Sequence, residues 1–384
     1  MQQDELAAWL RLALTPGVGN DAARRLLAAF GLPQAIFEQR PAAWRQLLTP
    51  AQAEALGELP PQLPEQLQAT REWLGGADDG LQRRLVTLGD AVYPASLLAM
   101  ADPPLMLYLS GQLRLLEAAG WPSRALAMVG SRNPTPQGAQ NARQFARAFA
   151  DAGLAVVSGL ALGVDGAAHE GALEGVGAAG RLATIAVIGT GIDRVYPRQH
   201  RELAHRIARQ GLIVSEYPLG TPPLAGNFPK RNRLIAGLAQ GTLVVEAALQ
   251  SGSLITARLA VEQGKEVFAI PGSIHSAQSR GCHALIRQGA KLVETAQDVL
   301  EELRWPGATT DASAPAHAAS GAVAPAHDPD GLLQALGADP VSLDALLART
   351  GLDTATLQAR LLELELDGQV GRLPGGLFQR LALG

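Results

Sequence analysis

The segment 227–237, NFPKRNRLIAG, gathers residue types suited to binding a nucleic acid. It contains one aromatic ring, Phe228, followed by Lys230 and then by Arg231, Asn232 and Arg233. Cations bind phosphates, and a flat ring can stack on an unpaired base with a stabilisation of about 1–3 kcal/mol per base. The segment therefore predicts part of a groove for a single polynucleotide strand. The alternative is that the ring belongs to the core and the arginines are internal ion-pair partners.

Small and hydroxyl-bearing residues follow several apolar runs of the chain. Amides in such turns can approach a ligand closely and hydroxyls add donors, so the turns predict a phosphate-binding crevice that the cations of 227–237 overhang. The purely structural alternative is that each turn is only a tight connection. The residues are Gly130, Ser131 and Arg132 after the first run, Ser158 and Gly159 after the second, Gly189 and Thr190 after the third, Ser251, Gly252 and Ser253 after the fifth, and Pro271, Gly272 and Ser273 after the sixth.

Four ionisable side chains offer acid–base chemistry. Asp165 and His169 stand four apart and would share one face of a helix, as an acid–base pair or as a structural contact. Glu216 and Glu246 follow the fourth and fifth runs and could act as catalytic acids. The favoured interpretation is that Glu216 and Glu246 balance the charges of Arg231 and Arg233, because carboxylates at a buried edge are usually paired.

The elements that would position these residues alternate regularly. Apolar runs without polar alternation predict strands buried on both faces, and the helical segments between them supply the crossovers that parallel strands need. The pattern predicts a doubly wound α/β sheet, in which ligands bind beyond the carboxyl ends of the strands. The runs are ALAMVG, LAVVSGL, ATIAVIGT, GLIVSEY, TLVVEAA and EVFAIPG.

Composition divides the 384 residues into parts. Residues 1–80 predict a module of short helices, and 81–305 hold the α/β domain. Residues 306–330 have almost no large apolar side chain and cannot offset the entropy of ordering, so they predict a disordered linker. Residues 331–384 predict a small C-terminal module.

The composition and net charge of the chain exclude several classes of protein. A hydrophobic content of 47% with 18% charged residues indicates a globular chain, and the net charge of -4 disfavours a wholly basic surface while leaving room for a local basic stripe. The sequence shows neither a signal peptide nor a long apolar span, so we expect a cytoplasmic protein without membrane insertion. The one cysteine, Cys282, excludes an intramolecular disulfide and a cysteine-based zinc cluster, and no metal or cofactor is expected.

Nucleotide-binding fingerprints are missing or misplaced. No GxxxxGK[ST] occurs, and the literal GxGxxG at 175–180 precedes a strand, so it predicts a loop. A nicotinamide-dependent oxidoreductase would also need an acidic residue after the second strand, which is absent.

Several segments, in this order, resemble the DNA-processing protein A family, also called Smf. They are MVGSRNPTPQG, VVSGLALGVDGAAHEGAL, TIAVIGTGIDRVYPRQHREL, SEYPLGTPP, FPKRNRLIAGL, VVEAALQSGSLITARLA and FAIPGSIHSAQSRGCHALIRQGAKLV. The resemblance implies an extended Rossmann domain that binds single-stranded DNA, forms a homodimer and, in many members, loads the RecA recombinase during natural transformation. It implies no enzymatic activity. By position, Arg132 resembles the family's phosphate-binding arginine and Phe228 resembles its base-contacting aromatic residue. Some members carry a lysine shortly before that aromatic residue, where this chain has LAG at 224–226. Lys230, on the other side of the aromatic residue, is expected to take the place of that lysine.

The flanking modules also fit this resemblance. LALTPGVGNDAARRLLAAFG resembles a helix-hairpin-helix unit of a SAM-like module, which either offers amides to a phosphate or only connects two helices. The end of the chain resembles a winged helix, but the acidic Glu363, Glu365 and Asp367 on its recognition helix favour a protein contact or a scaffold over a DNA groove.

One enzymatic alternative uses a similar fold. Lonely-guy phosphoribohydrolases cleave nucleoside monophosphates with a PGGxGTxxE signature. Here the sixth run ends in PGSIH, without the matching threonine and glutamate, so the enzyme hypothesis is the weaker one.

Overall fold

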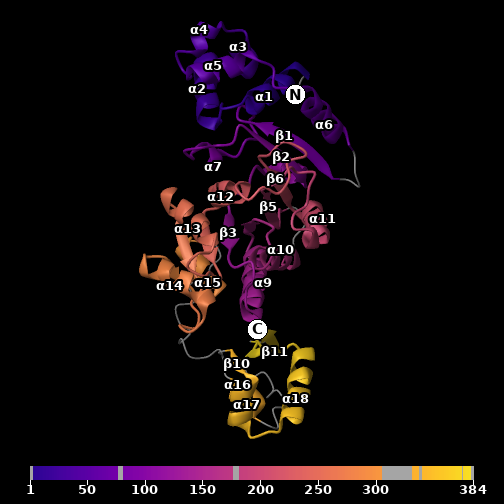
Figure 1. Ribbon diagram of the computed structural model, residues 1–384, viewed down its shortest axis with the longest axis vertical. Helices are drawn as coiled ribbons and strands as arrows, with labels where there is room; N and C mark the ends of the chain where they lie inside the picture. The colour runs from indigo at the N-terminus through magenta and orange to yellow at the C-terminus, as the bar shows by residue number, and fades with distance from the viewer. Residues whose placement is uncertain are drawn as a thin grey trace.

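The computed structural model describes residues 3–76, 81–175, 181–304, 331–336, 340–373 and 375–381. A cluster of short helices, a central sheet covered by helices and a small C-terminal unit follow one another along the long axis of the molecule (Figure 1). The predicted linker 306–330 and most of the GxGxxG loop, residues 176–180, lie outside the described residues.

The N-terminal part is helical. Its core includes Trp9, Leu10 and Leu26 and is continuous with Met106 and Tyr108 of the sheet, so these helices cover one end of the sheet. Figure 1 shows them beside the first two strands. The helices are α1 (Gln3–Leu14), α2 (Asn20–Phe30), α3 (Pro33–Phe37), α4 (Pro41–Trp44), α5 (Pro50–Gly57) and α6 (Leu63–Gly75).

The central sheet has nine strands in the order β1-β2-β6-β5-β4-β3-β7-β8-β9. The six apolar runs form β3 to β8, which pair in parallel as predicted. Two antiparallel strands, β1 and β2, extend the sheet beyond β6, and β9 adds a short parallel edge. The strands are β1 (Gln82–Thr87), β2 (Met106–Gly111), β3 (Ala125–Val129), β4 (Ala155–Ser158), β5 (Thr184–Ile188), β6 (Leu212–Ser215), β7 (Gly241–Val244), β8 (Glu266–Ala269) and β9 (Lys291–Leu292).

The strand order reverses between β3 and β7. The chain runs outward from β3 to β6 on one side and from β7 to β9 on the other, which creates a topological switch point at the carboxyl ends of β3 and β7. Helices cover both faces of the sheet, with a separate apolar core under each layer. They are α7 (Ala95–Leu98), α8 (Leu113–Ala119), α9 (Pro136–Asp151), α10 (Val164–Glu174), α11 (Arg201–Gln210), α12 (Asn227–Leu238), α13 (Ser253–Glu262), α14 (Arg280–Arg287) and α15 (Ala296–Glu302).

The C-terminal unit has its own core and a three-stranded sheet in the order β10-β12-β11. Ser342 and Asp353 cap the starts of its two longest helices through their side-chain oxygens. Gly371 is buried against Pro136 at the start of α9, where a larger side chain would overlap the proline ring. The elements are α16 (Leu332–Leu336), β10 (Val341–Ser342), α17 (Leu343–Thr350), α18 (Thr354–Leu366), β11 (Val370–Leu373) and β12 (Leu377–Arg380).

Among the described residues, no helix combines the length and the apolar character needed to cross a bilayer.

Candidate nucleic-acid interface

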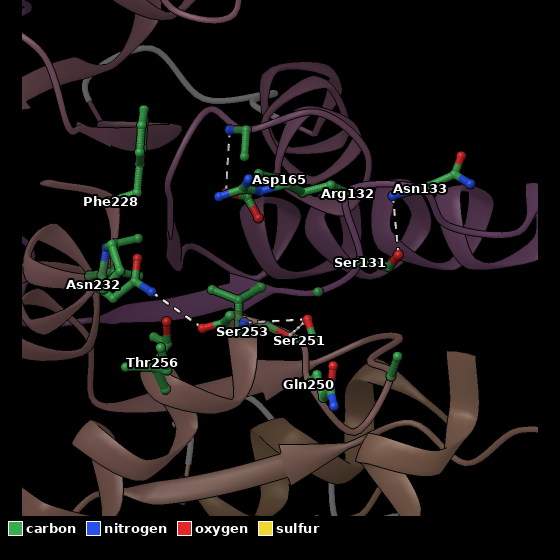
Figure 2. Close-up of a pocket in the computed structure, with 18 of the residues that line it drawn as sticks. Ser131, Arg132, Asn133, Asp165, Phe228, Asn232, Gln250, Ser251, Ser253 and Thr256 are labelled. Atoms are coloured by element: carbon green, nitrogen blue, oxygen red, sulfur yellow. Dashed lines mark hydrogen bonds between the residues drawn. The ribbon is translucent and has the colours of Figure 1, made fainter. Parts of the chain in front are cut away.

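A pocket of about 490 Å³ opens at the switch point between β3 and β7. In Figure 2, Phe228 and Arg132 lie above Ser251 and Ser253, which close the opposite side. The structure brings nine of the predicted residues to the lining of this pocket: Gly130, Ser131, Arg132, Phe228, Arg231, Asn232, Ser251, Gly252 and Ser253.

Arg132 and Phe228 form the mouth of the pocket. The guanidinium carbon of Arg132 lies 5.9 Å from the centroid of the Phe228 ring. Arg132 is exposed, and among the described residues no carboxylate pairs with it. A solvent-facing cation next to a half-buried aromatic ring presents one group for a phosphate and one for a flat, apolar molecule.

The position of Phe228 follows from close packing around the first turn of α12. Gly189 lies beneath the ring, and a Cβ atom there would come within 3.0 Å of a ring carbon. Asn227 donates its side-chain N–H to the Gly189 carbonyl at 3.2 Å, which ties the start of the helix to the turn after β5. Tyr196, which the sequence analysis did not single out, lies with its ring centroid 5.6 Å from that of Phe228 and is 48% exposed. The two rings together form an aromatic rim.

The backbone amides of the turns are used differently from the expectation. The Ser131 amide donates to the Glu246 carbonyl at 2.7 Å, and the Ser251 amide donates to the Ala248 carbonyl at 2.9 Å. The Gly159 amide donates to the Asp165 carboxylate at 3.1 Å. These three amides hold the turns in place and are not free for a phosphate, which leaves exposed Arg132 as the main candidate for the predicted anion binding.

Arg231 lies inside the protein while still touching the pocket. It is 3% exposed, and its Nη1 donates to the Val187 carbonyl at 2.7 Å. Burial lowers the pKa of Arg231 to about 10, against the opposing effect of the nearby Asp165 carboxylate. Gly159 leaves room for it, because a Cβ atom there would overlap the guanidinium. Arg231 is therefore internal, as the alternative held, but its hydrogen-bond partner is a backbone carbonyl and not a carboxylate in an ion pair.

Arg233 and Lys230 do not line the pocket. Arg233 forms an ion pair with Glu216 and a second one with Asp102 at 3.2 Å, and its side chain is only 13% exposed. Lys230 is exposed on the outer face of α12. The prediction that Glu216 balances the charge of an arginine is confirmed. The prediction that Arg233 lies over the pocket is wrong, because its guanidinium is directed toward Glu216 and Asp102.

Ser158 and Thr190 lie beneath the surface. The Ser158 hydroxyl donates to the Met128 carbonyl at 2.6 Å, and the Thr190 hydroxyl donates to the Arg194 carbonyl at 2.7 Å. Both residues are buried, so their hydroxyls stabilise the strand ends and do not reach the pocket. The prediction that these hydroxyls face a ligand is wrong for this structure, because both hydroxyls are directed to backbone carbonyls inside the fold.

The proposed acid–base groups have structural partners. His169 is fully buried with its Nδ1 2.7 Å from the Thr184 hydroxyl, and burial lowers its pKa to about 3, so the ring is neutral. Asp165 accepts from the amides of Gly159 and Ala161. These contacts confirm the structural interpretation of the pair.

Glu246 differs from the expectation that it balances an arginine. Its two carboxylate oxygens accept from the Thr135 amide at 2.9 Å and from the Thr135 hydroxyl at 2.6 Å. Thr135 is the N-cap of α9, so Glu246 fixes the start of that helix beside the pocket. Burial raises the pKa of Glu246, and the bonds from Thr135 oppose that shift.

Several amide and hydroxyl side chains line the pocket without having been predicted. They stand on helix faces or loops with no motif, so only the fold brings them together. In the described part of the chain, no group of His, Cys, Asp or Glu side chains is arranged to hold a metal ion. The unpredicted amide and hydroxyl residues are Asn133, Gln250, Thr256 and Gln278; Asp165, the acid–base candidate of the sequence, also lines the pocket.

An extended parallel sheet with a polar pocket at its switch point, joined to a small winged-helix unit, defines the chain as a Rossmann-like protein with an accessory winged helix. The family model for DNA recombination-mediator protein A matches residues 84–304, and the DprA winged helix domain model matches residues 314–376. The chain belongs to the DNA-processing protein A family.

Relatives and solved structures agree with this assignment. The chain is 42% identical to protein Smf of Escherichia coli over 76% of each chain, and 34% identical to protein Smf of Synechocystis over 99% of this chain and 100% of that one. The structure of DprA from Streptococcus pneumoniae superposes with a TM-score of 0.61 at 36% identity, covering 79% of this chain and 98% of that chain. DNA processing protein A of Helicobacter pylori, whose structure describes a unique single-stranded DNA binding mode, gives a TM-score of 0.50 at 32% identity, covering 58% of this chain and 96% of that chain.

Proposed function

We propose that this protein binds single-stranded DNA at the pocket between β3 and β7, protects the incoming strand and loads RecA recombinase onto it during natural transformation. The observation that carries the proposal is the pairing of exposed Arg132 with the Phe228 ring at the pocket mouth. The cation binds a phosphate while the ring stacks on a base. A base in a duplex is already stacked and paired, so this arrangement favours a single strand.

A binding role without catalysis agrees with the state of the carboxylates. Asp165 is held by two backbone amides beside Arg231, and Glu246 is held by Thr135. A general acid or base needs a carboxyl group that can reach the reacting atoms, and these groups are engaged within the fold. The phosphoribohydrolase alternative gains no support from them.

Phe228→Ala is expected to lower the affinity for single-stranded DNA about 5- to 30-fold, because one stacking contact of roughly 1–2 kcal/mol is lost while the Tyr196 ring remains. The salt dependence of binding should stay the same, since stacking releases few counterions. Fluorescence anisotropy across a salt series measures both quantities. Phe228→Leu is the matched variant: if it binds like the wild type, the ring serves packing against Gly189 and not stacking.

The loading step is tested by RecA assembly on a fluorescent single strand. We expect the protein to shorten the lag before RecA filaments grow, and Arg132→Ala to lose this effect under conditions where the wild type is saturating. Full DNA binding by the wild type without any change in the lag would contradict loading and leave the binding proposal intact.

We assign two surfaces to protein contacts. The homodimer implied by family membership is placed at α14 of the Rossmann domain, where Leu285 and Ile286 are half-buried beside a groove shared with α13. On α18, Leu362 and Leu366 are 56% and 80% exposed next to acidic Glu363. An apolar and acidic face suits a protein partner better than a phosphate backbone.

A further inference from the structure

Helix α11 and the turn before it carry a row of exposed arginines outside the pocket between β3 and β7. The segment 198–210, RQHRELAHRIARQ, holds four arginines and a single carboxylate, Glu202, although the whole chain has a net charge of -4. Arg198, Arg201 and Arg209 are exposed. Among the described residues, none of these three guanidiniums has a hydrogen-bond or ion-pair partner. Their donors are therefore available to a partner from outside the chain.

The amphipathic pattern of α11 aligns the arginines. Arg201 and Arg209 are eight positions apart, so they share one face of the helix and lie about 12 Å from each other along its axis. Arg198 stands one turn earlier, in the 3-10 turn that leads into the helix. The opposite face is buried against the core that α11 shares with α10 and is made of Leu203, Ala204, Ile207 and Ala208.

The row of arginines begins at the mouth of the pocket. Tyr196 of the aromatic rim stands two residues before Arg198. His200 Nδ1 lies 3.0 Å from the carbonyl oxygen of Leu160, and the next residue, Ala161, lines the pocket. The start of α11 is thus bound to the wall of the pocket, and the row leads away from the mouth along the helix.

The charge and the position of the row together point to one kind of occupant. Exposed arginines are often only solvated, so charge alone identifies no partner. A single strand longer than the pocket, however, carries a phosphate on every nucleotide and must run over the surface next to the mouth. Proteins that bind single strands use cations along the path of the backbone, and a guanidinium matches the geometry of a phosphate.

We propose that Arg198, Arg201 and Arg209 bind phosphates of the part of the strand that leaves the pocket past Tyr196, so that α11 is a second contact surface for the same DNA molecule. The inference rests on the proposed binding of single-stranded DNA and adds a surface outside the pocket. Contacts to phosphates carry no base information, so this surface contributes affinity for longer strands without sequence preference.

The test measures affinity against strand length by fluorescence anisotropy. The short probe is oligo-dT of about 5 nucleotides, near the lower limit of single-strand site sizes, and the long probe is several times that length. Arg201→Gln with Arg209→Gln should bind the short probe like the wild type and the long probe about 5- to 30-fold more weakly, the effect of two exposed charge contacts. For the long probe, the magnitude of the slope of log affinity against log salt concentration should decrease by roughly 1.4.

The matched control is Arg45→Gln with Arg71→Gln. Both of these arginines are exposed, have no partner among the described residues and belong to the N-terminal helical part, so the control removes the same charge at another place. It should keep the wild-type affinity for both probes.

Three results would overturn the assignment of α11 or the function beneath it. If the α11 variant keeps the wild-type affinity for the long probe, any gain with length comes from elsewhere, such as the pocket of a second copy, and the α11 surface is wrong. If the control loses as much affinity, only overall charge matters, and the surface is wrong again. In both cases binding of the short probe by the wild type leaves the proposed function intact, whereas a wild-type protein that binds neither probe contradicts that function itself.

Discussion

Arg132→Ala is expected to weaken binding of single-stranded DNA about 10- to 100-fold, because one charge-assisted hydrogen bond to a phosphate is lost. The loss should be nearly the same for every sequence, since a phosphate carries no base information. The magnitude of the slope of log affinity against log salt concentration should decrease by roughly 0.7, the value for one phosphate contact on a single strand. Anisotropy titrations at several salt concentrations give both numbers.

The control for this variant is Arg147→Ala. Arg147 lies on α9, is 63% exposed and pairs with Asp151 at 3.9 Å, and it does not line the pocket. Removing it changes the net charge by the same amount at a different place. Equal effects of the two substitutions would mean that Arg132 acts only through overall charge, and the pocket assignment would then be wrong.

Arg231→Met is expected to destabilise the folded protein by about 1–3 kcal/mol, because the Val187 carbonyl loses its donor and the buried Asp165 loses a nearby positive charge that favours its ionised form. Burial already raises the pKa of Asp165, although Arg231 and the amides of Ala161 and Gly159 oppose the shift. Without Arg231 the pKa of Asp165 rises further. A carboxyl group whose pKa is higher in the folded state favours folding when protonated, so the loss of stability should grow as the pH rises through that pKa and shrink in acid.

Urea unfolding at a series of pH values measures this loss. The double variant Asp165→Asn with Arg231→Met removes the uncompensated charge, so it should recover part of the stability and lose the pH dependence. A single Arg231→Met variant as stable as the wild type would show that the arginine is not the structural partner described above. Any change in DNA affinity is interpreted only for variants that remain folded.

The central sheet was predictable because its strands are buried on both faces. Residues 125–129 and 184–188 are apolar throughout, which leaves little alternative to a parallel strand flanked by helices. The antiparallel pair β1 and β2 escaped prediction: β1 begins with Gln82 and Arg83, and its pattern gave no clear strand signal. Continuous apolar runs identify internal strands better than edge strands.

The site was predictable only in part. Arg132 and Phe228 follow strand ends or begin a helix, so topology alone places them at the carboxyl edge. The direction of Arg231 depends on the Val187 carbonyl and that of Arg233 on the Glu216 carboxylate, and composition does not show which of these groups meet.

The most direct test of single-strand binding at the Arg132–Phe228 mouth is a competition experiment. Labelled single-stranded DNA bound to the wild-type protein is displaced by unlabelled single strand or by duplex of the same sequence, and the same titration is run with Phe228→Ala. The proposed site predicts that the single strand competes at far lower concentration than the duplex and that Phe228→Ala reduces this preference. Equal competition by duplex and single strand in the wild type would contradict it.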